Sequence, residues 1–198
     1  MRKLVVSNLM SLDGYYDGPG GDFMVMPLDE TFDAYNAERL RAADTLLVGA
    51  RSYRGFKGYW PPQADNPDAR PVIREIGRRN NAIDKVVVSD TLTEDQTGPW
   101  RSTTRIVRRA DAHKAIAELK RGDGREILVF GSRTLWNDLL AAGLVDELHL
   151  MVGAGVVGGG TPIFGTRPPG RLRLAEVRRS DGSDNLVLRY EVAGSGNG

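Results

Sequence analysis

Three short runs of apolar, mostly β-branched residues limit most strongly what this chain can fold into. The runs are residues 45–49, 85–89 and 126–131. Inside each run the residues do not alternate between polar and apolar, as they would in a strand with one face in water. Continuous apolar strands are typical of parallel sheets that helices cover on both faces. The runs therefore predict an α/β fold with a mostly parallel central sheet.

Amphipathic segments separate these runs, as such a fold requires. Residues 29–42 carry apolar side chains at helical spacing, residues 111–120 do so again, and another helix follows Ser132. A shorter helical pattern covers residues 71–80. Helices between successive strands are the usual connection in a parallel sheet, so the alternation supports the same fold class.

Further strands are predicted toward both ends of the chain. They cover residues 2–10, 105–108 and 145–152. Residues 171–178 and 185–192 alternate apolar and polar side chains on either side of a turn. That pattern predicts a C-terminal antiparallel hairpin. We expect this hairpin to be an antiparallel addition to the edge of the mostly parallel sheet.

Stretches rich in glycine and proline are predicted to be loops. Residues 17–22 contain successive glycines and a proline, and residues 56–71 contain Trp-Pro-Pro among several Asp and Asn. No linker divides the chain, so residues 1–193 are predicted to form one domain. The glycine-rich end, residues 194–198, is predicted to be a disordered tail.

Composition excludes several kinds of chemistry. The chain has no Cys and only two His, His113 and His149, so thiolate catalysis, disulfides and Cys- or His-rich metal sites are not expected. Lys+Arg and Asp+Glu number 27 and 26, which does not favour a nucleic-acid partner. The apolar runs are far shorter than the roughly 20 residues of a membrane span, and no signal-peptide pattern is present. A cytoplasmic protein with no membrane partner is predicted.

Three predicted strands end in glycine or hydroxyl residues. Gly49 is followed by Arg51 and Ser52, Ser89 stands at the end of the next strand, and Gly131 leads through Ser132 into a helix. Because parallel strands present their carboxyl ends at one edge of a sheet, these three turns are expected to lie together. Helix N-termini, Arg and hydroxyl groups are suited to phosphate. A phosphate-bearing ligand is therefore the hypothesis for this edge.

Each of these turns also has a purely structural interpretation. Gly49 could end its strand and do nothing more, and the sequence Ser89-Asp90-Thr91 is a common turn. The turn at Gly131 lacks the GxGxxG pattern of a Rossmann site, and no Walker-type Lys-Ser/Thr follows it. The three turns together are more informative than any one of them.

Taken in order, these segments resemble the dihydrofolate reductase-like family, and more closely the reductase domain of bacterial riboflavin biosynthesis and its single-domain relatives. The resemblance runs from about Arg2 to Val192. The segments that carry it are Ser11–Gly14, Leu47–Tyr53, Val86–Leu92, Val129–Ser132, Leu144–Leu148 and Gly158–Phe164. It implies an NADPH-dependent reductase that transfers hydride to a small heterocyclic substrate, usually as a homodimer.

The resemblance also implies which residues meet the cofactor. Gly49, Arg51 and Ser52 would contact its phosphates, and Ser89 would lie beside the adenosine 2′-phosphate. Asn8 and Met10 would flank the nicotinamide. The pyrophosphate would lie against Gly131, Ser132, Arg133, Thr134 and Leu135.

The sequence departs from the family pattern at two places. The family usually has Gly-Arg-x-Thr where this chain has Gly49-Ala50-Arg51-Ser52, so the cation is displaced by one residue. This displacement leaves open whether NADPH or NADH is preferred. Relatives commonly have a proline before the glycine-rich turn, whereas Met151–Gly155 has none, which bears on the floor of the substrate pocket.

Two carboxylates are candidates for a catalytic acid. Asp13 lies in the turn that resembles the riboflavin-type motif, and Asp33 lies on the first helix, where its spacing resembles that of the substrate-binding acid of dihydrofolate reductases. A carboxyl group in an apolar pocket would have a raised pKa and could deliver a proton. The structural alternatives are a simple Asx turn for Asp13 and a solvated helix face for Asp33.

Aromatic and paired acidic residues offer weaker candidates. Tyr59 and Trp60 could stack on a planar substrate from the predicted loop, or could simply pin that loop. Asp146 and Glu147 are interpreted as structural, and His149 as a strand residue with its hydrogen bonds satisfied. The leading hypothesis is an NADPH-dependent reductase of a pteridine- or pyrimidine-like heterocycle. The alternatives are a nucleotide-binding module without turnover and a flavin-binding redox protein.

Overall fold

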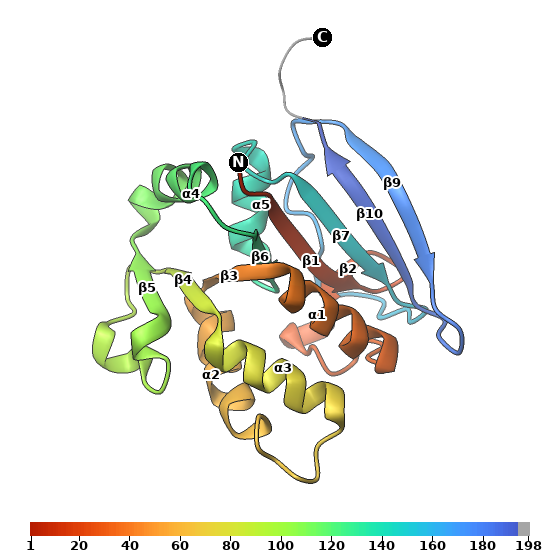
Figure 1. Cartoon of the computed structure of the whole chain (residues 1–198). Helices are drawn as coiled ribbons and strands as arrows, with labels where there is room; N and C mark the ends of the chain where they lie inside the picture. Colours follow the sequence, from red (N-terminus) through yellow and green to blue (C-terminus); the bar gives the residue numbers. More distant parts are fainter. Residues whose placement is uncertain (194–198) are drawn as a thin grey trace.

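An eight-stranded sheet forms the middle of the molecule (Figure 1). The structure is a computed structural model and describes residues 1–193. The strand order is β5-β4-β3-β6-β1-β7-β10-β9, in which β5 to β7 are parallel and β10 and β9 are antiparallel. The strands are β1 (Leu4–Met10), β3 (Ala43–Gly49), β4 (Asp84–Val88), β5 (Thr104–Val107), β6 (Glu126–Phe130), β7 (Glu147–Val152), β9 (Leu172–Arg179) and β10 (Leu186–Val192). The predicted mostly parallel α/β fold with a C-terminal antiparallel hairpin is confirmed.

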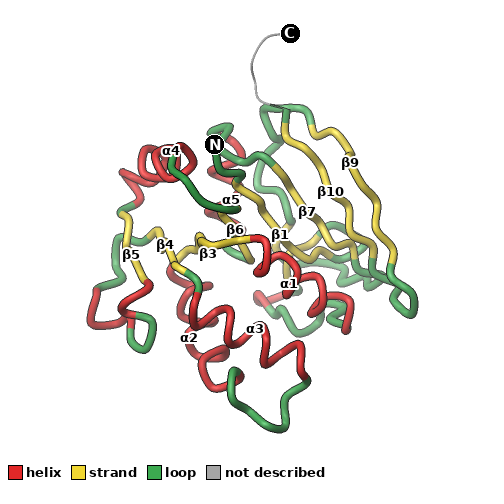
Figure 2. Tube along the Cα trace, viewed as in Figure 1, coloured by secondary structure: helices red, strands yellow, loops and turns green. Residues whose placement is uncertain are grey.

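Helices cover both faces of the sheet (Figure 2). They are α1 (Glu30–Ala42), α2 (Ala50–Gln63), α3 (Pro71–Ala82), α4 (Ala112–Arg121) and α5 (Arg133–Ala141). Strand β1 shows how the two layers share the sheet. Leu4 and Val6 pack with the residues of α4 and α5, whereas Val5, between them, packs with those of α1 to α3. Both faces of β1 are buried, which is why its sequence is continuously apolar.

Shorter elements lie beside the main sheet. Strands β2 (Tyr15–Asp17) and β8 (Thr161–Pro162) form a small antiparallel pair that the sequence did not predict. Single 3-10 turns cover Pro19–Gly21, Glu94–Thr97, Arg101–Thr103 and Arg109–Asp111. Both strands of the small pair lie in stretches rich in glycine, so neither has the run of apolar residues that marks the larger strands.

The segment predicted as a loop over residues 56–71 was assigned wrongly, because α2 continues to Gln63. The buried side chain of Tyr53 and the partly buried Phe56 and Trp60 follow helical spacing and pack on one core. Pro61 and Pro62 fall in the last turn, where each removes one backbone hydrogen bond, and the helix ends directly after them at Gln63. The predicted tail, residues 194–198, lies outside the described residues.

The direction of the helices follows from the connections. Helix α1 leads directly into β3 at Ala43, so it runs from the carboxyl edge of the parallel strands to their amino edge. Helices α2 and α5 each follow a strand at once or within two residues, so they begin at the carboxyl edge. Consequently the first turns of α1, α2 and α5 all lie toward one edge of the sheet.

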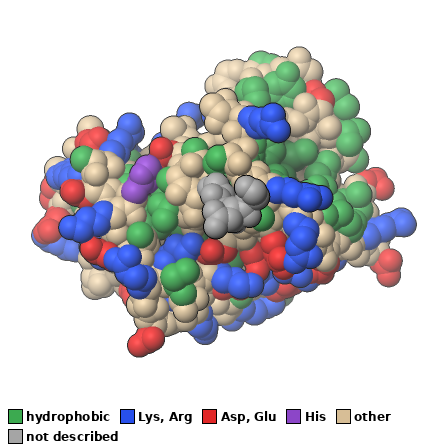
Figure 3. Space-filling view, turned by 90° about the horizontal axis from the view of Figure 1, so that it is seen from above, with side chains coloured by type: hydrophobic (Ala, Val, Ile, Leu, Met, Phe, Trp, Pro, Cys, Tyr) green, Lys and Arg blue, Asp and Glu red, His purple; other side chains and the backbone are tan. Residues whose placement is uncertain are grey.

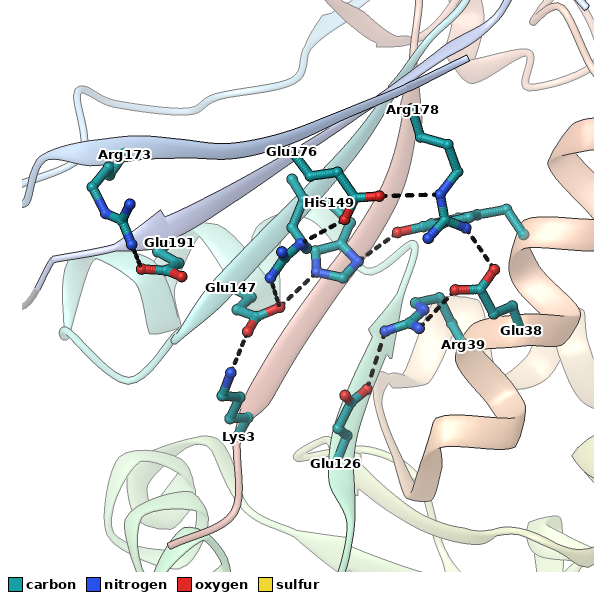
Figure 4. Close-up of polar contacts among 12 residues, drawn as sticks. Lys3, Glu38, Arg39, Glu126, Glu147, His149, Arg173, Glu176, Arg178 and Glu191 are labelled. Carbon is teal, nitrogen blue, oxygen red and sulfur yellow. Dashed lines mark hydrogen bonds and ion pairs between the residues drawn. The ribbon is translucent and has the colours of Figure 1, made fainter. Parts of the chain in front are cut away.

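Buried charges connect the C-terminal hairpin to α1 and β7 (Figure 4). Tyr35 Oη and His149 Nδ1 are 2.7 Å apart, and His149 Nε2 lies 2.9 Å from Glu147 Oε2. Lys3 Nζ donates to Glu147 Oε1 at 2.5 Å. These contacts agree with the structural interpretation of Glu147 and His149. Arg178, on β9, pairs with Glu38 of α1 and so reaches across the same face.

The surface is mixed in charge where Figure 3 shows it. Lys and Arg side chains are interspersed with Asp and Glu, and hydrophobic side chains gather toward the upper right of this face. Across residues 1–193, no helix has the length and apolar character needed to cross a bilayer. The same residues contain no cluster of three or more His, Cys, Asp or Glu with the arrangement of a metal site.

Candidate functional site

The ends of β3 and β6 meet at the carboxyl edge of the sheet and are joined by side-chain hydrogen bonds. The Gly49 amide donates to Ser132 Oγ at 3.0 Å, and the Ser132 amide donates to Ser52 Oγ at 3.1 Å. The two turns therefore hold each other in place. We call residues 49–52 and 131–133 the α2–α5 corner. Two of the three strand ends that the sequence singled out are thus in contact.

Two helices begin at the α2–α5 corner without a capping side chain. The N-cap residues are Gly49 for α2 and Ser132 for α5, and neither provides a side-chain cap to its own helix. The first N–H groups of a helix have no partner within the helix, and the helix dipole adds partial positive charge there. The corner therefore offers two sets of backbone donors to an anion.

The turn between β6 and α5 has an unusual backbone. Gly131 has φ +57° and Ser132 has φ +52°, so both lie in the left-handed region. For Ser132 this conformation costs about 1–2 kcal/mol relative to ordinary backbone. A Cβ at Gly131 would come within 3.1 Å of Tyr16 Oη and 3.4 Å of Ser52 Oγ. Glycine keeps this space open beside the helix N-terminus.

Two arginines add positive charge to the α2–α5 corner. Among residues 1–193, Arg51 has no carboxylate within ion-pair distance, and its guanidinium lies near Gly21. Arg133 donates from Nε to the Pro162 carbonyl, and its terminal nitrogen lies near Gly165. An unpaired guanidinium next to two uncapped helices favours binding of a group with several negative charges.

The end of β4 is built differently. Ser89 is 2% exposed, and its Oγ accepts hydrogen bonds from the amides of Thr91 and Leu92. This hydroxyl caps its own turn, as the structural interpretation of Ser89-Asp90-Thr91 expected. Nearby, Arg108 donates to the Ser89 carbonyl at 3.1 Å. The Ser89 Oγ is buried and accepts two hydrogen bonds within its own turn, and its contact with a 2′-phosphate stays a prediction.

Asn8 and Met10 lie on β1 and face the layer of α4 and α5, in line with Leu4 and Val6. Asn8 is 7% exposed, and its Nδ2 has no hydrogen-bond partner among residues 1–193. A buried amide donor without a partner costs about 1–3 kcal/mol, unless a ligand satisfies it. Asn8 is therefore a polar group with unused donor capacity near the carboxyl end of the central strand.

The remaining predicted residues of the corner divide by burial. Thr134 is exposed in the first turn of α5, and Leu135 is partly buried against the core. Only the backbone of Leu135 faces the helix N-terminus, because its side chain is used in packing. Thr134 has its hydroxyl at the surface of the same turn.

Asp13 holds a loop in place. Its carboxylate accepts from the amide of Gly158 at 2.8 Å and from that of Val157 at 3.2 Å. A hydrogen bond from Ser11, together with these backbone bonds, lowers the pKa of Asp13. The side chain is exposed, so the apolar pocket expected for a proton donor is absent at this position. A lowered pKa is the opposite of what an acid catalyst at neutral pH requires.

Asp33 differs from Asp13 in its burial and in the direction of its pKa shift. Its side chain is 15% exposed, and burial raises its pKa, although an ion pair with Arg70 works in the opposite direction. It lies in the first turn of α1, toward the carboxyl edge of the sheet. Asp29 caps the same helix by accepting from the Phe32 amide at 2.8 Å, which fixes this turn.

Tyr59 and Trp60 lie on α2 instead of a loop. They stand nine and ten residues after Ala50, about 15 Å along the helix from the α2–α5 corner. Tyr59 is 51% exposed, and Trp60 packs partly on the core. Their rings contact each other edge to face, with centroids 4.8 Å apart. The pair thus lies on a helix and not in the loop that both interpretations assumed, and its stacking on a substrate stays a prediction.

Sequence reasoning missed Tyr16. Its hydroxyl lies beside Gly131, although the residue belongs to β2, more than one hundred positions earlier in the chain. The turn at Asp13-Gly14 indicated that the chain reverses here, but it gave no sign that the next strand reaches the α2–α5 corner. Pairing of β2 with β8, which is only two residues long, brings Tyr16 there.

Comparisons with known proteins agree with this architecture. The family model described as "RibD C-terminal domain" matches residues 2–187. The uncharacterized protein YyaP of Bacillus subtilis (strain 168) is 27% identical over 165 residues, which are 82% of this chain and 80% of that protein.

Solved structures share the fold at low sequence identity. A putative riboflavin biosynthesis protein from Shewanella sp. PV-4 superposes with a TM-score of 0.65 at 19% identity and covers 96% of this chain and 99% of its own. The riboflavin biosynthesis reductase Rib7 of Saccharomyces cerevisiae has a TM-score of 0.60 at 18% identity and covers 97% of this chain and 90% of its own. At these identities the likeness establishes the fold.

Proposed function

Since the chain belongs to the RibD C-terminal domain family, we propose that it is a pyridine-nucleotide-dependent reductase of a pteridine- or pyrimidine-like heterocycle. The observation that carries the proposal is the α2–α5 corner, where two uncapped helix N-termini meet beside the unpaired Arg51. A dinucleotide carries its negative charge on a pyrophosphate, which matches donors and cations gathered at one point.

The residues present fit such a cofactor. A Cβ at Gly131 would fill the space beside Ser52 and Tyr16, so glycine leaves room for a phosphate to approach the backbone. Asn8 supplies a buried amide donor with no partner, on the central strand where a nicotinamide amide would need one. Gly49, Arg51, Ser52 and Gly131–Leu135 would hold the phosphates, with Asn8 and Met10 beside the nicotinamide. When bound, the reduced cofactor would supply hydride to the substrate.

The chain itself would position the partners and deliver a proton. Asp33 is the group we assign to proton delivery, because burial raises its pKa while Arg70 keeps its carboxyl oriented. Asp13 would fix the 153–160 loop at the mouth of the site through its two backbone bonds. The candidate site thus assigns the two carboxylates to different tasks.

We infer the preference between NADPH and NADH from which cationic side chains have no carboxylate partner among residues 1–193. Arg51 has no carboxylate partner in the described part of the chain, whereas the Ser89 hydroxyl is buried and accepts two hydrogen bonds from its own turn. We therefore assign selection of NADPH to Arg51, in spite of its displacement by one residue from the family pattern. An Arg51→Ala variant should lose affinity for both nucleotides through the shared pyrophosphate, and should lose more affinity for NADPH than for NADH.

Thermal unfolding with added nucleotide tests the proposal. A ligand that binds only the folded state raises stability by about 2.7 kcal/mol at one hundred times its Kd. We expect NADPH to raise Tm, and we expect NADPH oxidation with at least one heterocycle from a panel of dihydropterins and aminouracils. Absence of any NADPH-dependent shift would refute the assignment. Binding without oxidation across the panel would favour the nucleotide-binding module, and a yellow preparation would favour a flavin protein.

A further inference from the structure

Tyr16 stands at an irregularity in the β2–β8 pair. Tyr15 pairs with Pro162 and Asp17 pairs with Thr161, so two steps along β2 match one step along β8. Tyr16 is therefore the extra residue of a β-bulge. Bulges change the direction of a side chain and are frequent beside functional sites.

The neighbours of Tyr16 hold this bulge firmly. Asp17 accepts from the Thr161 amide at 3.0 Å and is 7% exposed. Gly160 has φ +129°, and a Cβ there would come within 2.1 Å of the Asp17 carbonyl oxygen. Only glycine allows the two segments to pass so closely. The backbone contacts of the neighbouring Asp17 therefore help to fix the position of Tyr16.

The Tyr16 hydroxyl reaches the α2–α5 corner. A Cβ at Gly131 would lie 3.1 Å from this hydroxyl. Burial raises the pKa of Tyr16, and Asp17 raises it further, while Arg51, Arg133 and the Ser132 backbone act in the opposite direction. Those three groups are members of the same corner. A phenol that stays protonated is a hydrogen-bond donor among cations and backbone amides.

The ring of Tyr16 also contacts an aromatic side chain. Phe23 packs against it with ring centroids 6.4 Å apart. The phenol is therefore anchored through its ring and its backbone, and its hydroxyl has no structural bond to a side chain among residues 1–193.

We propose that Tyr16 is a binding residue, whose hydroxyl donates a hydrogen bond to the pyrophosphate of a dinucleotide held at the α2–α5 corner. The inference rests on the proposed function, and adds to it a donor from a third segment of the chain. The bulge sets the direction of the side chain, Phe23 contacts its ring, and the absence of a side chain at Gly131 leaves room beside its hydroxyl. A phosphate at the corner would then be bound from three sides by α2, α5 and β2.

A Tyr16→Phe variant tests this role, because it removes one oxygen and keeps the ring that packs on Phe23. The matched control is Tyr15→Phe, the same change on the neighbouring residue. Affinities are measured by calorimetric titration with NADPH and, separately, with inorganic pyrophosphate. A hydrogen bond to a charged group corresponds to about a tenfold change in Kd or more. We expect that loss for both ligands in Tyr16→Phe, and a change of less than about twofold in Tyr15→Phe.

The two arms separate this inference from the proposed function. If the wild-type chain binds NADPH and Tyr16→Phe binds it equally well or more tightly, Tyr16 only packs and the inference is wrong. If the wild-type chain binds pyrophosphate but not NADPH, the proposed function fails and the pyrophosphate arm alone decides on Tyr16. If the chain binds neither, both are overturned. Equal Tm values for the two variants confirm that the comparison is between folded proteins.

Discussion

At the scale of single residues, Glu147 has the most constrained carboxylate of the hairpin network. It is 5% exposed and contacts both Lys3 and His149 (Figure 4). Burial alone would raise its pKa, but the hydrogen bonds from Lys3 and His149 outweigh burial and lower the pKa to about 2. The ionised form is therefore favoured in the folded state. Its contribution to stability is complete above the usual pKa of 4.5 and is lost as pH falls toward 2.

A Glu147→Gln variant should lower the free energy of unfolding at pH 7 by about 2 kcal/mol, because a buried charged partner is lost. The difference from wild type should shrink as pH falls from about 4.5 toward 2, because the glutamate of the unfolded chain is protonated in this range, whereas the folded carboxylate is protonated only near pH 2. Urea unfolding at several pH values measures both effects. The control is Glu191→Gln, which breaks a surface pair with Arg173 and should cost less than about 1 kcal/mol. Equal losses in the two variants would contradict the account of the buried network.

Asp33 and Asp13 can be distinguished by kinetics. For the first heterocycle that the wild-type chain reduces, Asp33→Asn should lower kcat by roughly 100-fold or more, because a proton donor is removed. Its Kd for NADPH should not change. Since burial raises the pKa of Asp33, the wild-type rate should fall as pH rises through that pKa, and the variant should lose this dependence.

Asp13→Asn is the comparison for this prediction. It keeps one oxygen that can accept from the 153–160 loop, so it should alter KM more than kcat. If Asp13→Asn abolishes kcat while Asp33→Asn leaves the pH profile intact, the assignment of the two acids is reversed.

At the scale of elements, the turn between β6 and α5 combines backbone strain with an open space. Gly131→Ala places a methyl group against the Tyr16 hydroxyl in a left-handed conformation. Gly182→Ala has the same kind of backbone, with φ +77°, but nothing lies within 4 Å of its Cβ. Each variant should lose about 1 kcal/mol of stability from the backbone alone. Only Gly131→Ala should also weaken NADPH binding, by at least tenfold.

Unfolding and titration of these two glycine variants measure the two effects separately. Similar NADPH affinities in Gly131→Ala and wild type would mean that the space beside Gly131 is not used by the cofactor. A Gly182→Ala variant with weakened NADPH binding would point to a general effect on the fold.

Elements of the sheet could be predicted from the sequence because each depends on local pattern. The continuous apolar run at 126–131 is β6, and the alternating runs near the C-terminus are β9 and β10. Helix α2 was missed, because Trp-Pro-Pro looks like a loop signal. The spacing of Tyr53, Phe56 and Trp60 is helical, but only the structure shows that all three side chains pack on the same hydrophobic core.

The candidate site was only partly predictable, because some of its residues are brought together by contacts between segments far apart in the sequence. The turns at Gly49 and Gly131 were singled out correctly as neighbours, since parallel strands bring their carboxyl ends together. Ser89 looked equivalent in sequence, but its hydroxyl caps its own turn. Tyr16 could not be found, because its place depends on a bulge and on a two-residue strand far away in the sequence.

At the scale of the whole molecule, the outer face of the hairpin is apolar and open. Leu174 and Val177 on β9 are 48% and 54% exposed, and they lie on the face shared with Leu188 and Tyr190. Neighbouring exposed apolar side chains on an edge strand are unusual in a monomeric protein. We propose that this face is the contact of a homodimer.

A Leu174→Ser/Val177→Ser double variant tests the dimer. Light scattering should give about twice 21.7 kDa for the wild-type chain and a mass near 21.7 kDa for the variant. The control is Arg173→Ser/Arg179→Ser, which replaces two exposed, charged side chains of the same strand. A monomeric wild-type chain would contradict the proposal.

The central claim is that the α2–α5 corner binds the phosphates of a pyridine nucleotide. Calorimetric titration of NADPH into the wild-type chain and into Arg51→Ala tests it most directly. The account predicts one site per chain for the wild type, and at least tenfold weaker binding for Arg51→Ala, because an unpaired guanidinium is removed beside the phosphates. No binding to the wild-type chain at millimolar NADPH, or equal affinity in the two proteins, would contradict it.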